Sequence, residues 1–419
     1  AKLRVQQVKD VEYHLSFQFR RNQPFFTAEL LLKFCPKKGP LLENLFLDAT
    51  ELTIQQIQID SHEIPESFHQ IQNRRIALPP EYFSSSNKPH EVWIRYQGSF
   101  HSNQVGFFRF YDQETQEDYF FTHLEPYGAN KVFPCFDQPD IPGRFSVVLK
   151  FPWGWQAVTN TYFQIEPETE NEEEQFWRSQ QSLPFSTYLF ALALGPLKMV
   201  QNEKYPHIRL YLRPNRIENP QNFFDASFLF ETAAHNLAFF ERQFDTPHPY
   251  EKLDLVGVPS YINGGMENVG AIFLSETQMV TSEPPSQFQR YNQFLLISHE
   301  ISHLWFGDLV TMAWWNDLWL KESFATLMSY EAAAQISYFR DEVWVYFHER
   351  AKRDLFRLDS HSRIKPVIRD VPDAETADWS FDGICYRKGA ALLKQLQLYV
   401  GTENLLREDL STFFDLLKF

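Results

Sequence analysis

The residues best suited to chemistry lie in the segment 299–303, His-Glu-Ile-Ser-His, which matches the pattern H-E-x-x-H. Two histidines four positions apart share one face of a helix, with Cβ atoms roughly 5–6 Å apart. The imidazoles of His299 and His303 can therefore reach one zinc ion at Zn–N distances of about 2.0–2.1 Å. Glu300 lies about 100° around the helix from His299, where it can face a water molecule without binding the metal. The pattern predicts a zinc site with Glu300 as general base.

The neighbours of this segment indicate that the histidines are not on a freely solvated helix face. The apolar residues around them are Leu295, Leu296, Ile301, Leu304 and Trp305. Buried polar groups need partners, and a metal ion is one such partner. Two histidines on an ordinary helix are the alternative, and this environment makes it less attractive.

Glu322 is the predicted third ligand. Gly307 is placed to end the first helix as a C-cap, and Asn316 is placed to begin a second helix as its N-cap. That second helix would fold back on the first and carry Glu322 in its second turn. Two histidines and a glutamate leave one coordination position for water, which is the pattern of catalytic zinc sites. A surface glutamate is the alternative, but apolar residues surround Glu322.

The first part of the chain is predicted to form strands. In segment 11–19 (VEYHLSFQF) apolar and polar residues alternate, which is typical of a half-buried strand. Turn-rich pieces separate this segment from similar ones. These further segments are 26–34, 52–59, 91–100, 145–151 and 190–197. Repeated strands without long helical periods favour a sheet-built domain.

The pattern changes near residue 200. From Asn219 to Phe244 apolar residues, beginning with Phe224, recur at helical steps of three to five. Two further helical stretches follow at 286–306 and 316–334. We therefore predict a multidomain α+β protein with an all-β N-terminal domain (1–198) and an α+β catalytic domain (199–419).

Composition narrows the classes of partner. The formal net charge is −15, which argues against nucleic acid and anionic membrane surfaces. No stretch approaches the ~18 apolar residues of a membrane span, and we expect no signal peptide. Three distant cysteines, Cys35, Cys135 and Cys385, build neither a disulfide framework nor a cysteine zinc site. A reducing, cytoplasmic compartment is therefore expected.

Four segments in the family's order resemble the M1 family of zinc aminopeptidases, the aminopeptidase N-like gluzincins. The match runs through 299–325, HEISHLWFGDLVTMAWWNDLWLKESFA. The segment 264–268, GGMEN, is similar to the family's G-x-M-E-N exopeptidase motif. The segments 381–390 and 122–140 resemble those that carry the catalytic tyrosine and border the substrate site. The resemblance implies one zinc ion per chain, a thermolysin-like catalytic domain and peptide substrates with a free N-terminus.

The resemblance also implies residue roles. Tyr386 matches the donor that stabilises the tetrahedral oxyanion. Glu267 matches the carboxylate that binds the substrate's α-ammonium, and Glu125 matches a second one. The remaining residues of the motif, expected to border the substrate, are Gly264, Gly265, Met266 and Asn268. Taken alone, Tyr386 would be read as structural and the motif as a glycine turn before a strand.

The sequence departs from the family pattern at three points. The residues around the third ligand are Lys321-Glu322-Ser323, where the family often has Asn-Glu-Gly. The exopeptidase motif is GGMEN, a variant also found in the leukotriene A4 hydrolase branch. The chain stops at Phe419, so we expect a fragment lacking the family's C-terminal helical region.

Three other functions stay open at this point. A thermolysin-type zinc endopeptidase shares the metal pattern but has no need of amine-binding glutamates. A bifunctional epoxide hydrolase and aminopeptidase rests on GGMEN alone. A catalytically inactive M1-like binding scaffold is disfavoured because every expected ligand and the base are present.

Overall fold

The computed structural model describes residues 2–37, 45–83, 88–165, 174–360 and 365–400. Its contacts divide the chain into two compact units. The N-terminal unit comprises Ala1–Lys198 and Asn268–Ala271, and the C-terminal unit comprises Met199–Glu267 and Ile272–Phe419.

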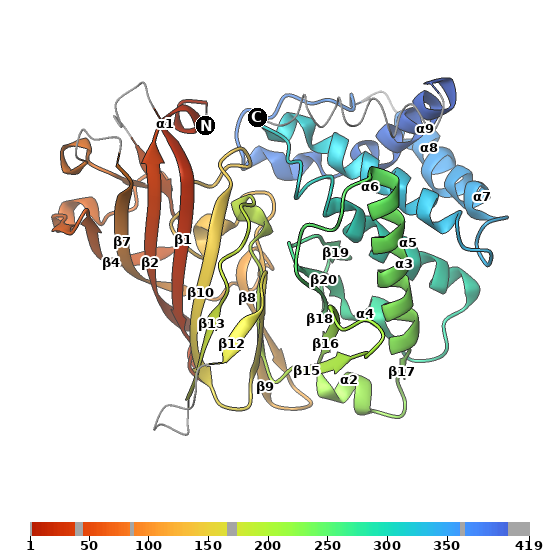
Figure 1. Ribbon diagram of the computed structural model, residues 1–419, viewed down its shortest axis with the longest axis horizontal. Coiled ribbons are helices and arrows are strands. Elements are labelled where there is room, and N and C mark those ends of the chain that lie inside the picture. Colours follow the sequence, from red (N-terminus) through yellow and green to blue (C-terminus); the bar gives the residue numbers. More distant parts are fainter. Residues whose placement is uncertain (1, 38–44, 84–87, 166–173, 361–364, 401–419) are drawn as a thin grey trace. The chain divides into compact units, whose positions relative to one another are not determined.

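The main sheet of the N-terminal unit has eight strands within the described residues, in the order β12-β13-β10-β1-β2-β7-β4-β5 (Figure 1). Strand β1 (Val8–Gln18) is antiparallel to β2 (Phe25–Pro36) and parallel to β10 (Gly143–Pro152). The other strands of this sheet are β4 (Leu52–Ile59), β5 (His62–Glu63), β7 (His90–Ser99), β12 (Phe163–Ile165) and β13 (Glu174–Ser179).

A second sheet of the N-terminal unit has the order β11-β14-β9-β8. Its antiparallel strands are β8 (Gly106–Asp112), β9 (Glu117–His123), β11 (Gln156–Thr159) and β14 (Leu192–Gly195). Phe26 of β2 lies 5.6 Å, between ring centroids, from Phe107 of β8. Phe19, just after β1, meets Phe107 at 5.5 Å and Phe120 of β9 at 6.3 Å. Inward-facing aromatic side chains therefore build the core between the two sheets.

The C-terminal unit is built on a five-stranded sheet with the order β15-β16-β18-β20-β19. Its strands are β15 (Lys198–Gln201), β16 (Ile208–Leu212), β18 (Leu253–Val258), β19 (Gly265–Met266) and β20 (Ala271–Ser275). Strands β16 and β18 are parallel, and β18 is buried along its whole length. Continuous burial is typical of a strand that is covered on both faces.

Helices cover this sheet and supply the rest of the C-terminal core (Figure 1). The longest are α3 (Ala226–Phe244), α5 (Gln287–His303) and α6 (Leu318–Ala333). Shorter helices of this unit are α2 (Pro214–Glu218), α4 (Glu276–Met279), α7 (Val343–Phe347), α8 (Asp354–Asp359) and α9 (Gly389–Val400). The β-domain followed by an α+β domain that the sequence predicts is confirmed.

Small elements complete the described residues. The remaining strands pair as β3 (Phe46–Asp48) with β6 (Arg75–Ala77) and β17 (Phe223–Phe224) with β21 (Val280–Thr281). The remaining helix is α1 (Arg4–Gln7). The 3₁₀ turns are Glu66–Phe68, Pro80–Tyr82, Ala129–Lys131, Thr187–Leu189, Trp315–Asp317 and Thr376–Ser380, and the π-helical stretches are His348–Arg353 and Ile384–Lys388.

The start of α3 corrects one sequence prediction. Phe224 was expected within the helix, but it lies in β17 and pairs with Val280. The helix begins only after Asp225, whose Oδ1 accepts the backbone N–H of Phe228 at 3.0 Å. An N-capping aspartate sets the boundary that apolar spacing alone placed too early.

Both helix ends around the predicted metal ligands also differ from the prediction. Helix α5 ends at His303 with Leu304 as its C-cap, so Gly307 is not the cap. Helix α6 begins at Leu318, directly after the 3₁₀ turn Trp315–Asp317. Asn316 is not its N-cap, since Asn316 Oδ1 instead accepts the backbone N–H of Val371 at 2.9 Å.

Among the helices of the described residues, none combines the length and hydropathy needed to cross a lipid bilayer.

The aromatic core beneath α5 gives a stability prediction. Phe240 of α3 is fully buried, and its ring centroid lies 5.7 Å from that of Phe244 and 5.9 Å from that of Trp305. Phe240→Ala should lower the free energy of unfolding by about 3–5 kcal/mol, because it leaves a cavity. Urea unfolding followed by tryptophan fluorescence measures this change.

The matched control is Phe356→Ala, since Phe356 of α8 is 64% exposed. It should change the free energy of unfolding by no more than about 0.5 kcal/mol. Equal losses in the two variants would contradict this assignment of the core.

Candidate metal centre

Helix α5 carries both histidines of the metal pattern. It begins with a capping box, in which the backbone N–H of Ser286 donates to Gln289 Oε1 at 2.8 Å and Ser286 Oγ accepts the backbone N–H of Gln289 at 3.3 Å. Its apolar residues recur three to four positions apart and are buried. They are Tyr291, Phe294, Ile297 and Ile301. The helix is thereby fixed against the core, with His299 in its last full turn and His303 at its end.

Helix α6 brings Glu322 to the same place. Glu322 is the fifth residue of α6 and is 2% exposed. The ring of Phe324, two positions further on, lies 3.7 Å, between centroids, from that of Phe306, which follows α5. Gly307 has a φ of +138°, and a Cβ there would lie 3.2 Å from His303 Nδ1. Glycine thus lets the chain turn close beside His303.

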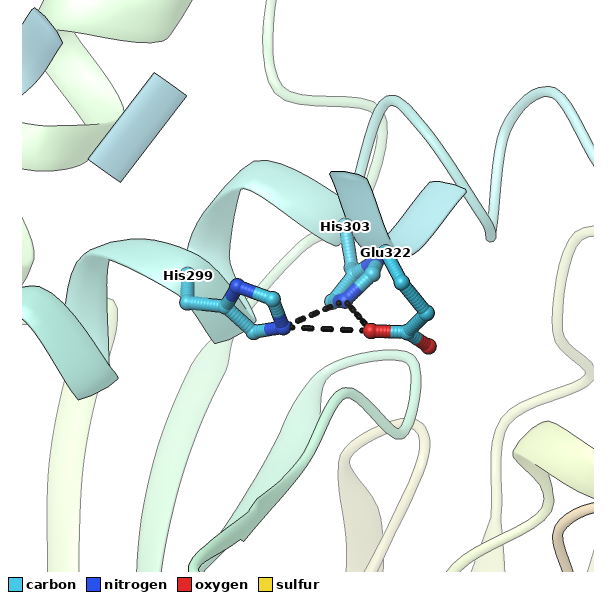
Figure 2. A group of neighbouring side chains, drawn as sticks. All are labelled: His299, His303 and Glu322. Carbon is cyan, nitrogen blue, oxygen red and sulfur yellow. Dashed lines mark hydrogen bonds and ion pairs between the residues drawn. The ribbon is translucent and has the colours of Figure 1, made fainter. Parts of the chain in front are cut away.

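The three predicted ligands point toward one another (Figure 2). The Nε2 atoms of His299 and His303 are 3.1 Å apart. Glu322 Oε2 lies 3.3 Å from His299 Nε2 and 3.5 Å from His303 Nε2. The structure therefore brings together two imidazoles from one helix and a carboxylate from the next.

This donor set fits zinc. Ligands bound tetrahedrally at about 2.0–2.1 Å are separated by roughly 3.3–3.4 Å from one another, from the geometry of a tetrahedron. The three separations, from 3.1 to 3.5 Å, bracket that value. Two nitrogens and one oxygen are also the donors found in catalytic zinc sites that keep a position open.

Hydrogen bonds orient the imidazoles. His303 Nδ1 lies 2.8 Å from the carbonyl oxygen of Phe306, so its N–H can donate to that carbonyl and leave the Nε2 lone pair for a metal. His299 Nδ1 lies 3.5 Å from Thr326 Oγ1 of α6. Contacts of this kind fix the tautomer and the ring orientation of metal-binding histidines.

Glu300, the predicted base, is 4% exposed and lies against the backbone of β19. A Cβ at Gly265 would meet Glu300 Oε1 at 2.2 Å, so only glycine leaves room for this carboxylate. Burial raises the pKa of Glu300 well above its usual range, and the carboxylate of Glu267 raises it further. Glu267 directly follows β19 and is 3% exposed.

The charges around the centre favour a cation. Burial alone would lower the pKa of His303, but Glu267 and Glu322 raise it to about 10. Burial opposes ionisation of Glu322, yet Lys321 and His303 hold the pKa of Glu322 well below its usual range. Burial lowers the pKa of His299. Buried carboxylates thus draw positive charge to this point, which is what a divalent metal ion supplies.

Tyr386 lies beside the centre on the π-helical stretch Ile384–Lys388. Its ring centroid is 6.0 Å from that of His299. Ser323, next to the predicted third ligand, donates from Oγ to the carbonyl oxygen of Cys385 at 2.5 Å. A Cβ at Gly389 would lie 1.8 Å from Ser323 Oγ, so glycine is required there. The hydrogen bond from Ser323 therefore links the stretch Ile384–Lys388, which carries Tyr386, to α6.

The other predicted site residues fall in two places. Gly264 has a φ of +79°, and Met266 of β19 is buried and pairs with Phe273. Asn268 and Glu125 belong to the N-terminal unit, Glu125 lying just after β9. That these residues border the substrate stays a prediction.

Two neighbours of Glu322 were noted in the sequence only as departures from a pattern. Lys321 is 4% exposed and forms ion pairs with Glu267 and Glu322. Ser323 forms the tether to Cys385. The available signal was a lysine and a serine within a mostly apolar helix, but Glu267 and Cys385, their partners from other elements, are distant in sequence.

Two family models match the chain. Residues 9–189 match the peptidase M1 N-terminal domain, and residues 228–419 match the peptidase family M1 domain.

Relatives from three organisms are similar to this chain over most of its length. The chain is 31% identical to an aminopeptidase N of Streptomyces lividans over 368 residues, 85% of this chain and 41% of the relative. It is 30% identical to a leucyl aminopeptidase of Saccharolobus solfataricus over 368 residues, 87% of this chain and 44% of the relative. It is 32% identical to an aminopeptidase M1-A of Oryza sativa subsp. japonica over 317 residues, 74% of this chain and 35% of the relative.

The chain therefore spans less than half the length of these relatives. The family resemblance carried by its motifs is confirmed, and the protein belongs to the M1 family of peptidases.

Proposed function

We propose that this protein is a zinc-dependent aminopeptidase that hydrolyses the N-terminal bond of peptides with a free N-terminus. The observation that carries the proposal is the convergence of His299, His303 and Glu322 beside two further buried carboxylates, Glu300 and Glu267. The names of the relatives, among them aminopeptidase N and leucyl aminopeptidase, support the same reaction.

Zinc held by the three ligands would supply Lewis-acid activation of the scissile carbonyl and of water. Glu300 would accept the proton of the attacking water and pass it to the leaving amine. A pKa raised by burial suits a carboxyl group that must both take up and release a proton near neutral pH.

Tyr386 would donate its hydroxyl hydrogen to the oxyanion that develops on the carbonyl. Its place beside His299 and the tether from Ser323 to Cys385 support this role. A donor held before the reaction needs no reorganisation when charge develops.

Glu267 would bind the α-ammonium of the substrate through a charge-assisted hydrogen bond. Glu125 is proposed as a second amine-binding carboxylate, on the family resemblance alone. Gly264, Gly265, Met266 and Asn268 are proposed to border the substrate for the same reason.

Two alternative functions would differ from an aminopeptidase in how the protein treats peptides. A zinc endopeptidase would cut peptides whose N-terminus is blocked. An inactive scaffold would bind peptides without hydrolysis.

We also propose the cytoplasm as the compartment, because Cys35, Cys135 and Cys385 form no disulfide.

Glu300→Gln should leave zinc binding intact and lower kcat by about 10²–10⁴-fold, because glutamine cannot accept the proton of water. Turnover of aminoacyl fluorogenic substrates and zinc content by atomic absorption measure the two effects. Glu283→Gln, at an exposed position, is the control and should retain activity. A Glu300→Gln enzyme with normal kcat would refute the assignment of the base.

Glu267→Gln should lower kcat/KM for free-amine substrates by about 10–100-fold, since it weakens a charge-assisted hydrogen bond. The wild-type protein should leave the N-acetylated form of the same peptide uncut. Glu251→Gln, exposed in the same unit, controls for the change of charge. Equal cleavage of free and acetylated peptides by the wild type would exclude an exopeptidase.

Tyr386→Phe should lower kcat by about 10²–10³-fold with a small change in KM, because only the oxyanion donor is removed. Steady-state kinetics with one aminoacyl substrate separate the two constants. Tyr338→Phe is the matched control, as Tyr338 is 58% exposed. A Tyr386→Phe enzyme that changes KM alone would assign the hydroxyl to substrate binding.

A further inference from the structure

Lys321 is a buried cation between two buried carboxylates. Its ammonium group contacts Glu267 Oε1 and lies 3.1 Å from Glu322 Oε1. All three side chains are 3–4% exposed. A buried ammonium group needs such partners, so charge compensation alone would account for an ion pair here. Charge compensation does not explain why Lys321 contacts one particular oxygen, Oε1, of each carboxylate.

The two oxygens of Glu322 face different partners. Oε1 lies near Lys321, whereas Oε2 lies 3.3 Å from His299 Nε2 and 3.5 Å from His303 Nε2. Rotation of the carboxylate would separate Oε1 from Lys321 while moving Oε2 away from the imidazoles. Lys321 therefore holds one particular oxygen of the third ligand toward the histidine pair.

Glu267 is held in the same manner. Its contact with Lys321 uses Oε1, one of its two oxygens. The charge-assisted hydrogen bond fixes the carboxylate before any substrate arrives. The second oxygen, Oε2, is then presented in one orientation to a ligand amine.

Lys321 itself has little freedom. It lies in the second turn of α6, and its Cδ passes 3.4 Å from where a Cβ at Gly307 would stand. The stem thus runs along the turn that follows α5. Because both its alkyl chain and its ammonium group are held in place, Lys321 can keep the two carboxylates at a fixed separation.

We propose that Lys321 is a positioning residue that couples the metal site to the amine site. It directs Glu322 Oε2 to the metal and leaves Glu267 Oε2 for the substrate's α-ammonium. This inference rests on the proposed aminopeptidase function. It predicts two effects of removing one side chain, weaker zinc binding and weaker discrimination of ligands that carry an amine.

The experiment measures both effects in the whole purified protein. The variants are Lys321→Met, which keeps most of the alkyl chain, and Lys321→Gln, which keeps a polar group and serves if the first variant fails to fold. Lys204→Met, at an exposed position, is the matched control. Circular dichroism confirms folding before each measurement.

Zinc affinity is measured by competition with a chromogenic chelator. Amine recognition is measured from the inhibition constants of L-leucine hydroxamate and of 4-methylpentanehydroxamate, which lacks only the amine. Their ratio isolates the contribution of the amine. A change that merely loosens the site would weaken both inhibitors equally and leave the ratio unchanged.

In the Lys321 variants we expect the zinc dissociation constant to rise about 10–100-fold. We expect the advantage of the amine-bearing hydroxamate to fall about tenfold, the effect of one weakened charge-assisted hydrogen bond. Lys204→Met should match the wild type in both measurements.

Absence of either effect in a folded variant overturns the proposal. The wild type tests the proposed function separately: if it binds the two hydroxamates equally, amine recognition itself is wrong. A wild type that prefers the amine, with Lys321 variants that keep this preference, refutes only the role of Lys321.

Discussion

Burial of like charges is the constraint on which this site depends. Glu267, Glu300 and Glu322 lie within the C-terminal unit, each no more than 4% exposed. Such burial is costly unless positive charge lies nearby. Lys321 supplies one positive charge beside Glu267 and Glu322, and a zinc ion held by His299, His303 and Glu322 would supply two more. In the proposed function, a metal ion would therefore also offset the burial of these carboxylates.

Glycines at three contact points let the side chains converge. Gly265 leaves room for Glu300, Gly307 lets the chain turn beside His303, and Gly389 admits the hydroxyl of Ser323. In each case a Cβ would meet a side chain that carries part of the site. The aromatic core beneath α5 and α6 holds the helices that carry the predicted ligands, so packing and the proposed chemistry depend on the same elements.

Sequence periodicity predicted the long N-terminal strands and the helices of the C-terminal unit, because alternation and helical spacing leave clear patterns. It gave no comparable signal for β18, which is buried on both faces. H-E-x-x-H predicted two ligands because their contact is local, and Glu322 followed from the fold-back of α6. Glu267, which contacts Lys321, and Cys385, which contacts Ser323, lie 54 and 62 positions away, so no local pattern could indicate these contacts.

A crystal of the protein grown with zinc, with data collected on both sides of the zinc absorption edge, tests the central claim most directly. The account predicts one anomalous peak within about 2.0–2.2 Å of His299 Nε2, His303 Nε2 and Glu322 Oε2. A peak bound elsewhere, or these three side chains turned apart with no peak between them, would contradict it.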